Sequence, residues 1–352
     1  MTITNARVAI PIEVQRAYRD NFPRHILSTS LYVQSAIMHA LAIKHGHHRL
    51  RINFEPYIVL TAARGARLSE IAQQLGISRQ AANQAANQIE AAGYVRRCAD
   101  PSDGRAKLLI HTARGKALIK QGVREASTIQ AQLQDIVGKR ALVRATATLT
   151  QLNRGLGLLP HLAHPTHGRD LLMAALLPRL ADHITDRLRQ LTMAKGHPDL
   201  KRSFGQVLTC IGPTGGRMQQ MAKAHDVSKQ AISAIASELE AIGYIERCPD
   251  PADARQVVLQ LTGTGKRLLI DSVSSVDELA AEFTDRLGAG KFEQLQDTMA
   301  QLYRSLQLEE DIFGHAEISD TREIARQLYR ELGEQGAKAL GQILITGESI
   351  SE

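Results

Sequence analysis

The sequence predicts a mainly α-helical fold in which one unit, with a small β-hairpin, occurs twice. The first observation is an internal repeat: Arg67–Leu118 aligns without a gap on Arg217–Leu268, an offset of 150 residues, and 21 of the 52 aligned pairs are identical. The second is composition, because Ala, Leu and Gln are abundant, aromatic residues are few and Trp is absent, a balance that favours helices. So long a period indicates a duplicated domain rather than a solenoid.

The repeated segment begins with two short helices joined by a tight turn. Leu68–Leu75 carries apolar residues three and four positions apart, Gly76 interrupts the run, and Ser78 is placed to cap a second helix. Two helices around a glycine turn are typical of a helix-turn-helix. The inward stripe of the second helix is predicted to be Ala81, Ala82, Ala85, Ala86 and Ile89.

After Gly93 the composition changes from that of helices to that of strands. Tyr94–Cys98 and Lys107–Thr112 are strand-like, and Ala99–Ala106 between them is rich in Pro, Asp, Ser and Gly. A helix-turn-helix followed by a two-stranded hairpin is a winged helix. The second copy repeats the serine before the second helix, the glycine after that helix and the loop between the strands. We therefore expect two winged helices in the chain.

The ordered motifs resemble those of the MarR family of winged-helix transcription regulators. In the first copy they are Ser78–Gln80, Ile89–Arg97, Asp100–Arg105 and Thr112–Gly115. The second copy has Leu239–Arg247, Asp250–Arg255 and Thr262–Gly265. The resemblance implies double-stranded DNA as the partner, and a helical dimerisation layer built from the first and last helices of each unit. Members usually act as homodimers, each subunit placing one recognition helix in the major groove.

Because both units lie on one chain, we expect a covalently fused pseudo-dimer with a pseudo-two-fold axis and a helical, dimerisation-like layer. The expected organisation is a first winged-helix domain at 1–156, a linker at 157–168, a second domain at 169–308 and a C-terminal helical tail at 309–352. The linker is rich in Pro and Gly, and Thr321–Gly333 of the tail is helical by pattern. Such a chain acts as a monomer or associates further. A two-fold dimer reads half-sites about 34 Å apart, and unlike recognition helices predict unlike half-sites.

Polar side chains cover the predicted outer face of each recognition helix. Gln and Asn offer paired donors and acceptors to adenine, and Arg bridges the two acceptors of guanine. The alternative for this face is a solvated surface. The candidates on the first helix are Arg79, Gln80, Asn83, Gln84 and Asn87. The second helix offers Lys229, Gln230 and Ser233, with Ala234 and Ser237 in place of Gln84 and Asn87, and is therefore the poorer reader.

The hairpin loops carry the same acidic and basic residues in both copies. Asp103 and Arg105 recur as Asp253 and Arg255. A wing tip can insert Arg into the minor groove, where the potential is most negative, and in the resembled family the Asp orients this Arg through the wing backbone. The alternative is a turn stabilised by an internal ion pair. Candidate phosphate contacts are Lys107, Arg64, Arg67, Arg217 and Lys229.

Composition and motif spacing argue against other classes of function. The net charge is +7 and the pI about 9.4, which suits a polyanionic partner. We expect no membrane span and no signal peptide in Met1–Ile10, and an odd count of three cysteines favours a reducing cytoplasm. Cys98, Cys248 and Cys210 are interpreted as small buried apolar residues.

No catalytic arrangement, metal site or cofactor motif is predicted. The histidine groups at His161, His164 and His167 and at His45, His47 and His48 lack acidic or cysteine ligands at a convincing spacing. We therefore expect a cytoplasmic, sequence-specific DNA-binding transcription regulator, a repressor tuned by a small-molecule effector. The alternative is a protein-interaction module that kept the winged-helix fold but lost specific operator binding. The few polar residues on the second recognition helix and the extra C-terminal tail favour this alternative.

Overall fold

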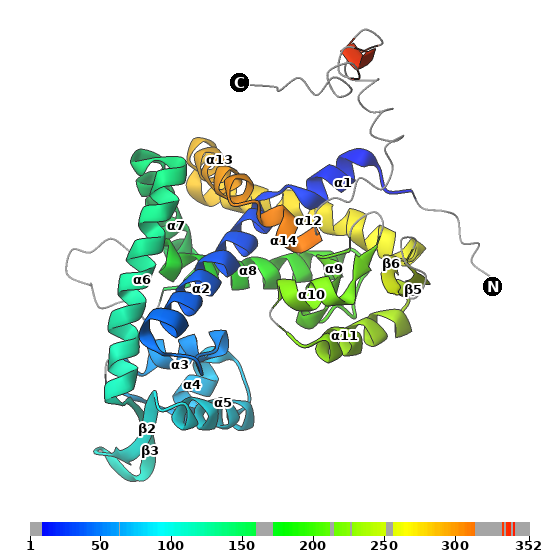
Figure 1. The fold of residues 1–352 in the computed structure, drawn as a ribbon. Coiled ribbons are helices and arrows are strands. Elements are labelled where there is room, and N and C mark those ends of the chain that lie inside the picture. The colour runs from blue at the N-terminus through cyan, green and yellow to red at the C-terminus, as the bar shows by residue number, and fades with distance from the viewer. Residues whose placement is uncertain are drawn as a thin grey trace.

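The computed structural model describes residues 9–62, 64–159, 172–211, 215–225, 227–250 and 256–313, with a few more between 333 and 341. Two winged-helix units extend in different directions from one shared block of helices (Figure 1). In that view the first unit, with α5, lies below the block and the second, with α11, lies to its right. Most of the predicted linker and tail lies outside the described residues, including nearly all of Thr321–Gly333.

The 150-residue offset extends well beyond the aligned segment. In the first half the elements are α2 (Phe22–His45), η1 (Ile52–Phe54), α3 (Glu55–Leu60), β1 (Ala66–Arg67), α4 (Leu68–Leu75), α5 (Arg79–Ala91), β2 (Val95–Asp100), β3 (Asp103–His111), α6 (Ala113–Val137) and α7 (Lys139–Gly155). The second half has α8 (Met173–Ala194), η2 (Arg202–Phe204), α9 (Gly205–Leu208), β4 (Gly216–Arg217), α10 (Met218–Ala224), α11 (Lys229–Ala241), β5 (Ile245–Pro249), β6 (Val257–Leu261), α12 (Gly263–Leu287) and α13 (Ala289–Ser305). Each element therefore has its partner 150 residues on, with shifted ends in a few.

The shared block is one hydrophobic core to which both halves contribute. Its buried apolar side chains come from α2, α6 and α7 of the first half and from α8, α12 and α13 of the second. Phe22 of α2 packs edge-on against Phe292 of α13 with ring centroids 5.0 Å apart, and against Phe283 of α12 at 6.2 Å. Such edge-to-face pairs stabilise a core beyond their buried area. This core is the predicted helical layer, and it joins the two halves.

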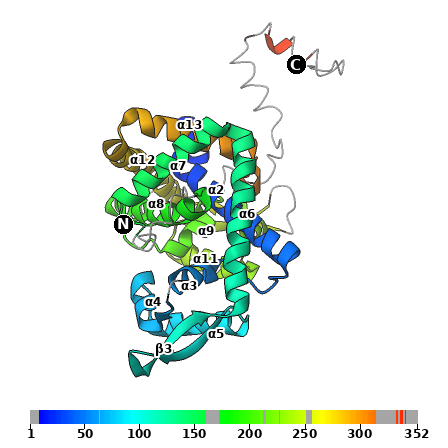
Figure 2. The ribbon, with the colours of Figure 1, turned by 90° about the vertical axis from the view of Figure 1, so that its left-hand side faces the viewer.

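Each winged-helix unit has a separate core of its own. The first gathers around Phe54, Ile71, Ile89 and Tyr94, and the second around Phe204, Met221, Leu239 and Tyr244. The sheet of the first unit has three antiparallel strands in the order β1-β3-β2, and that of the second has the order β4-β6-β5. Figure 2, turned by 90° from Figure 1, shows the hairpin β2–β3 extending beyond the lower end of α6.

Local signals set the ends of the predicted helices. Ser78 Oγ accepts a hydrogen bond from the backbone N–H of Ala81 at 3.1 Å, so it caps α5 as expected. Gly76 ends α4 with φ of 64°, and Gly46 ends α2 with φ of 71°, a left-handed conformation that glycine adopts readily. In the same way Ser228 Oγ caps α11 through the N–H of Ala231 at 3.1 Å.

Several predicted boundaries were wrong. The sequence predicts one core helix over Phe54–Arg64, but α3 ends at Leu60, and the short η1 precedes it. The hairpin loop is tighter than Ala99–Ala106, because Asp100 and Asp103 already pair across the turn. The short strands β1 and β4 were missed, since two residues carry no recognisable alternation. Ala81 is exposed rather than part of the inward stripe.

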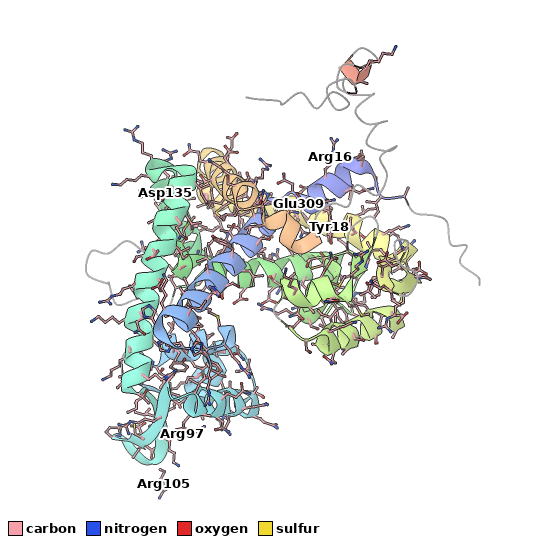
Figure 3. All side chains as sticks on the ribbon, in the orientation of Figure 1. Arg16, Tyr18, Arg97, Arg105, Asp135 and Glu309 are labelled. Atoms are coloured by element: carbon pink, nitrogen blue, oxygen red, sulfur yellow. The ribbon has the colours of Figure 1, made fainter. Side chains whose placement is uncertain are left out.

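Two short helices outside the repeat contact helices of the second half of the chain. These are α1 (Ile12–Arg19) and α14 (Leu308–Phe313). Arg19 of α1 forms an ion pair with Glu309 of α14 at 2.6 Å, and Arg304 of α13 forms one with Asp20 at 2.6 Å. Figure 3 labels Glu309 of α14 and Tyr18 of α1.

One helical span, Ile12–His45, is long and apolar enough to cross a membrane by length and composition, with a mean hydropathy of 1.4 over its window. Phe22, Ile26 and Val33 in this span are buried in the helical layer.

Candidate nucleic-acid interface

The outer face of α5 presents the five predicted residues together. The small or apolar side chains Ala82, Ala86 and Ile89 are buried against the first core. The opposite face therefore points to solvent, and each of its predicted side chains is exposed: Arg79, Gln80, Asn83, Gln84 and Asn87. The helix thus offers a continuous polar surface with both donors and acceptors, which direct base readout requires.

Arg97 of β2, which the sequence reasoning did not select, organises the C-terminal half of that face. Its Nη2 donates to Asn83 Oδ1 at 3.0 Å and to Asn87 Oδ1 at 2.7 Å. Its Nη1 forms an ion pair with Glu90, whose Oε1 also accepts the backbone N–H of Arg97 at 2.9 Å. The two carboxamide oxygens therefore turn towards the strand, and the NH₂ groups remain for an outside acceptor.

The first wing is tied by an ion pair to β1, the strand that leads into α4. Arg67 Nη2 lies 2.6 Å from Asp100 Oδ2, and Asp100 also accepts from the backbone and side chain of Ser102 at 2.8 and 2.7 Å. The Ser102 hydrogen bonds and then the Arg67 guanidinium lower the pKa of Asp100 to about 2. Arg67 thus anchors the wing, and Arg217 does the same with Asp250 at 2.6 Å. The phosphate contacts expected of these two arginines remain predictions.

Arg105 lies at the exposed tip of the first wing. Figure 3 shows its side chain at the lower extremity of the molecule, away from the helical layer. Asp103 Oδ1 accepts the backbone N–H of Arg105 at 3.2 Å, so it orders the turn that carries the arginine. Asp103 Oδ2 also lies 3.6 Å from Arg67 Nη1. The predicted alternative, an ion pair within the wing, is thus made by Arg67, while Arg105 projects outward.

The second unit has the same framework with a less polar recognition helix. Lys229 and Gln230 of α11 are exposed, whereas Ser233 is half-buried. Arg247 occupies the place of Arg97, and its Nη2 donates to Ser237 Oγ at 3.1 Å and to the Ser233 carbonyl at 3.4 Å. The predicted wing residues Asp253 and Arg255 lie outside the described residues.

A histidine–tyrosine pair connects each winged helix to the helical layer, and sequence reasoning missed it. His47 Nδ1 shares a hydrogen bond of 3.1 Å with the Tyr94 hydroxyl, and His47 Nε2 lies 2.7 Å from Gln121 Oε1 of α6. In the second unit His197, Tyr244 and Asp271 repeat the arrangement at 3.0 and 2.9 Å. The repeat could have revealed this pair, because His47 and His197 are also 150 residues apart in the sequence.

The cysteines need a correction. Cys98 and Cys248 are half-buried on β2 and β5 rather than buried, and Cys210 is buried as expected. Burial raises the pKa of the Cys210 thiol, which disfavours the thiolate that redox chemistry requires. His161, His164 and His167 lie outside the described residues.

A cavity of about 420 Å³ lies between the helical layer and the core of the second unit. Its walls come from α1, α2, α8, α9, α12 and α14, and they are mostly apolar. Tyr18 and Arg189 both line this cavity. Burial raises the pKa of Tyr18 to about 12, so its hydroxyl stays protonated and donates to the Leu208 carbonyl.

Two segments of the chain, residues 58–106 and 205–257, match models of the MarR family. No curated protein matches the chain. Similar solved structures include CouR from Rhodococcus jostii RHA1 bound to p-coumaroyl-CoA, which is 22% identical over 36% of this chain and 88% of that one, with a TM-score of 0.30. The transcriptional regulator Tm0710 from Thermotoga maritima is 20% identical over 37% and 93%, with a TM-score of 0.28.

A third solved structure is the transcriptional repressor CouR bound to a 23-mer DNA duplex, which is 23% identical over 39% of this chain and 87% of that one, with a TM-score of 0.28. The alignments cover almost all of each of these solved chains, but only a little more than a third of this chain. The two family segments fall on the two copies of the repeat, so the chain carries two MarR-like winged helices in tandem.

Proposed function

We propose that the two MarR-family segments make this chain a sequence-specific, double-stranded-DNA-binding transcription regulator that acts as a single-chain pseudo-dimer. Supporting this, each unit holds a complete helix-turn-helix and a hairpin, and both are attached to one hydrophobic core. In this proposal the shared core does the work of a dimer interface. The protein is a repressor located in the cytoplasm.

The observation that carries the proposal is the outer face of α5. All five predicted side chains on this face are exposed, while Ala82, Ala86 and Ile89 on the opposite face are buried. Arg97 holds Asn83 and Asn87 in one orientation, so two side chains of this face are ordered before any DNA is bound. Arg79, Gln80 and Gln84 are the remaining base-contacting candidates, and Arg105 is the minor-groove candidate.

The two units contribute unequally in this proposal. Lys229 and Gln230 at the start of α11 contact the backbone or one edge of a base pair, while Ser233 is half-buried and Ala234 has no polar group. The target therefore has unlike half-sites, one read in detail and the other held mainly through phosphates. The second-wing residues Asp253 and Arg255 are assigned by analogy with Asp103 and Arg105.

The test is a selection of genomic DNA fragments by the purified protein, followed by a salt titration on the selected duplex. We expect one discrete site with unlike halves about one helical turn apart, and an affinity that falls steeply with salt because Lys and Arg displace counterions. Equal, weak binding to all fragments would overturn the proposal. It would favour instead the protein-interaction module, for which the weakly polar face of α11 is the supporting observation.

A small-molecule effector completes the proposed regulation. The cavity between the helical layer and the second unit has the size and the apolar lining of a site for a small organic ligand. The cavity lies between the helical layer, which joins the two halves, and the second winged-helix unit, which contains α11. A ligand bound there is placed to change the separation of the two recognition helices.

A further inference from the structure

We propose that Arg97 leaves Asn83 and Asn87 able to act only as hydrogen-bond donors, so that α5 reads its half-site at guanine or thymine rather than at adenine. These two are the keto bases, whose edges in the major groove carry a carbonyl oxygen. This reading of the half-site rests on the DNA-binding function proposed above and adds to it a chemical rule for the first half-site.

The Arg97 guanidinium fixes which end of each carboxamide remains for a partner. A guanidinium has N–H donors and no acceptor, so a carboxamide bonded to it must present its oxygen. Arg97 Nη2 has two N–H groups, and they are used by Asn83 Oδ1 at 3.0 Å and Asn87 Oδ1 at 2.7 Å. Both Asn residues are exposed. Their NH₂ groups are therefore available to an outside acceptor.

Glu90 holds the Arg97 side chain in this position. Its carboxylate pairs with Arg97 Nη1, and its Oε1 accepts the backbone N–H of Arg97 at 2.9 Å. Glu90 lies in the last turn of α5 and Arg97 lies on β2, so the pair joins the recognition helix to the wing. The carboxamides are thus oriented before DNA arrives, which lowers the entropy cost of ordering them on binding.

A carboxamide that can only donate distinguishes the bases by their acceptors. In the major groove guanine presents N7 and O6 and thymine presents O4, whereas cytosine presents an amino group. Adenine presents N7 beside its N6 amino group, and the two-bond contact of Asn with adenine needs an oxygen for that amino group. In Asn83 and Asn87 this oxygen is held by Arg97. Guanine and thymine are therefore favoured at both positions.

Arg79 extends the donors along the same side of α5. Arg79, Asn83 and Asn87 follow one another at intervals of four residues, so they form one row on the helix. At 1.5 Å per residue the row is about 12 Å long, which equals about three to four base-pair steps. Arginine also has donors only and contacts guanine best. Gln80 and Gln84 are exposed beside this row, and contacts to adenine fall to them.

The second unit keeps the arginine but lacks the two carboxamides. By the 150-residue offset, Ser233 and Ser237 replace Asn83 and Asn87. Ser237 Oγ accepts from Arg247 Nη2 at 3.1 Å and donates its one proton to the Ser233 carbonyl at 3.0 Å. The Ser237 hydroxyl then has no donor left for a base, and Ser233 is half-buried. The keto rule therefore applies to the first half-site alone.

The test is selection of duplexes from a random library by the full-length chain, followed by affinity measurements on single base-pair changes. Asn83→Ala and Asn87→Ala identify the contacted positions, because each variant should lose the base preference at one position only. There, exchange of G·C for T·A should change wild-type affinity less than about threefold, since a keto base stays on the same strand. Reversal to C·G or A·T should weaken binding at least about fivefold, because an amino group replaces the acceptor.

Variants of Arg97 distinguish orientation of the carboxamides from a purely structural role. Arg97→Ala should bind A·T at both positions within about twofold of T·A, whereas Arg97→Lys, which keeps a donor, should retain a keto preference of at least about threefold. Arg247→Ala is the matched control and should leave both positions as in the wild type. Without DNA, the side-chain amide NMR signals of Asn83 and Asn87 should shift in Arg97→Ala and stay unchanged in Arg247→Ala.

The outcomes separate this inference from the proposed function. A discrete selected site with adenine or cytosine at either contacted position would overturn the keto rule and leave the DNA-binding function intact. The same holds for a folded Arg97→Ala variant, checked by circular dichroism, that keeps the wild-type preference. If the wild type selects no duplex, both fail. The base-pair reversals use the wild type, so they decide the question even if Arg97→Ala does not fold.

Discussion

Two glycines in the same helix should respond in opposite directions to the same substitution. An ideal Cβ at Gly115, in the first turn of α6, would lie 2.1 Å from the Tyr94 carbonyl oxygen and 3.1 Å from its carbonyl carbon. Both obstacles are backbone atoms, so no rotamer change relieves them. At Gly122, two turns further along α6, a Cβ would meet nothing within 4 Å. Gly115 lets α6 cross closely over the start of β2, and this crossing fixes the winged helix against the helical layer.

The magnitudes follow from these contacts. A Gly122→Ala change removes backbone entropy from the unfolded chain and should raise the free energy of unfolding by about 0.5–1 kcal/mol. A Gly115→Ala change carries the same gain, but the clash requires a shift of roughly 1 Å and should cost about 1–3 kcal/mol in a close-packed crossing. Gly265→Ala should act likewise on the second unit, where the Cβ would lie 2.0 Å from the Tyr244 carbonyl oxygen.

The assay is urea denaturation followed by circular dichroism, since the chain has no Trp, combined with hydrogen exchange of peptides from each unit. Gly115→Ala should shift the transition of the first unit to lower urea and increase exchange in β2 and β3, leaving the second unit protected. A Gly115→Ala variant as stable as Gly122→Ala would refute the close crossing. Equal loss of protection in both units would refute their separate cores.

Three further predictions concern the candidate interface. Arg105→Ala should lower DNA affinity by about tenfold or more, whereas Arg144→Ala, on an exposed site of α7, should not; gel shifts at fixed salt compare them. The pKa of Asp100 is about 2, below the usual value near 3.9, so its contribution to wing stability is complete above about pH 4 and is lost as the pH falls towards 2; hydrogen exchange of the wing should show this loss in the wild type and not in Asp100→Asn. Arg97→Ala frees the carboxamide oxygens of Asn83 and Asn87 to accept from adenine, so selection from random duplexes should shift towards adenine in the first half-site only.

Much of each winged helix could be predicted from the sequence because its signals are local. The bounds of α4 match the prediction at Leu68–Leu75. The spacing of apolar residues, a capping residue and a left-handed glycine act within a few residues of one another. Because the two copies align without a gap, the same assignment applies to the second copy. The family matches confirm the tandem arrangement.

What could not be predicted depends on contacts between distant residues. Arg97 meets Asn83 only when β2 folds back along α5, and the role of Arg67 depends on Asp100, 33 residues away. The cavity in the second unit requires Arg24 of α2 to reach Thr209, 185 residues further along the chain. Nothing in the local pattern of an arginine distinguishes a wing anchor or a cavity wall from a phosphate contact. The roles of the predicted recognition and wing residues remain predictions.

The central claim is that one chain does the work of two subunits, and the mass of its DNA complex tests it most directly. Sedimentation of the purified protein with its selected duplex should give a complex of one 38.6 kDa chain per duplex, with both half-sites protected from cleavage. A complex containing two chains per duplex, each protecting one half-site through its first unit, would contradict the single-chain pseudo-dimer and assign the helical layer a purely structural role.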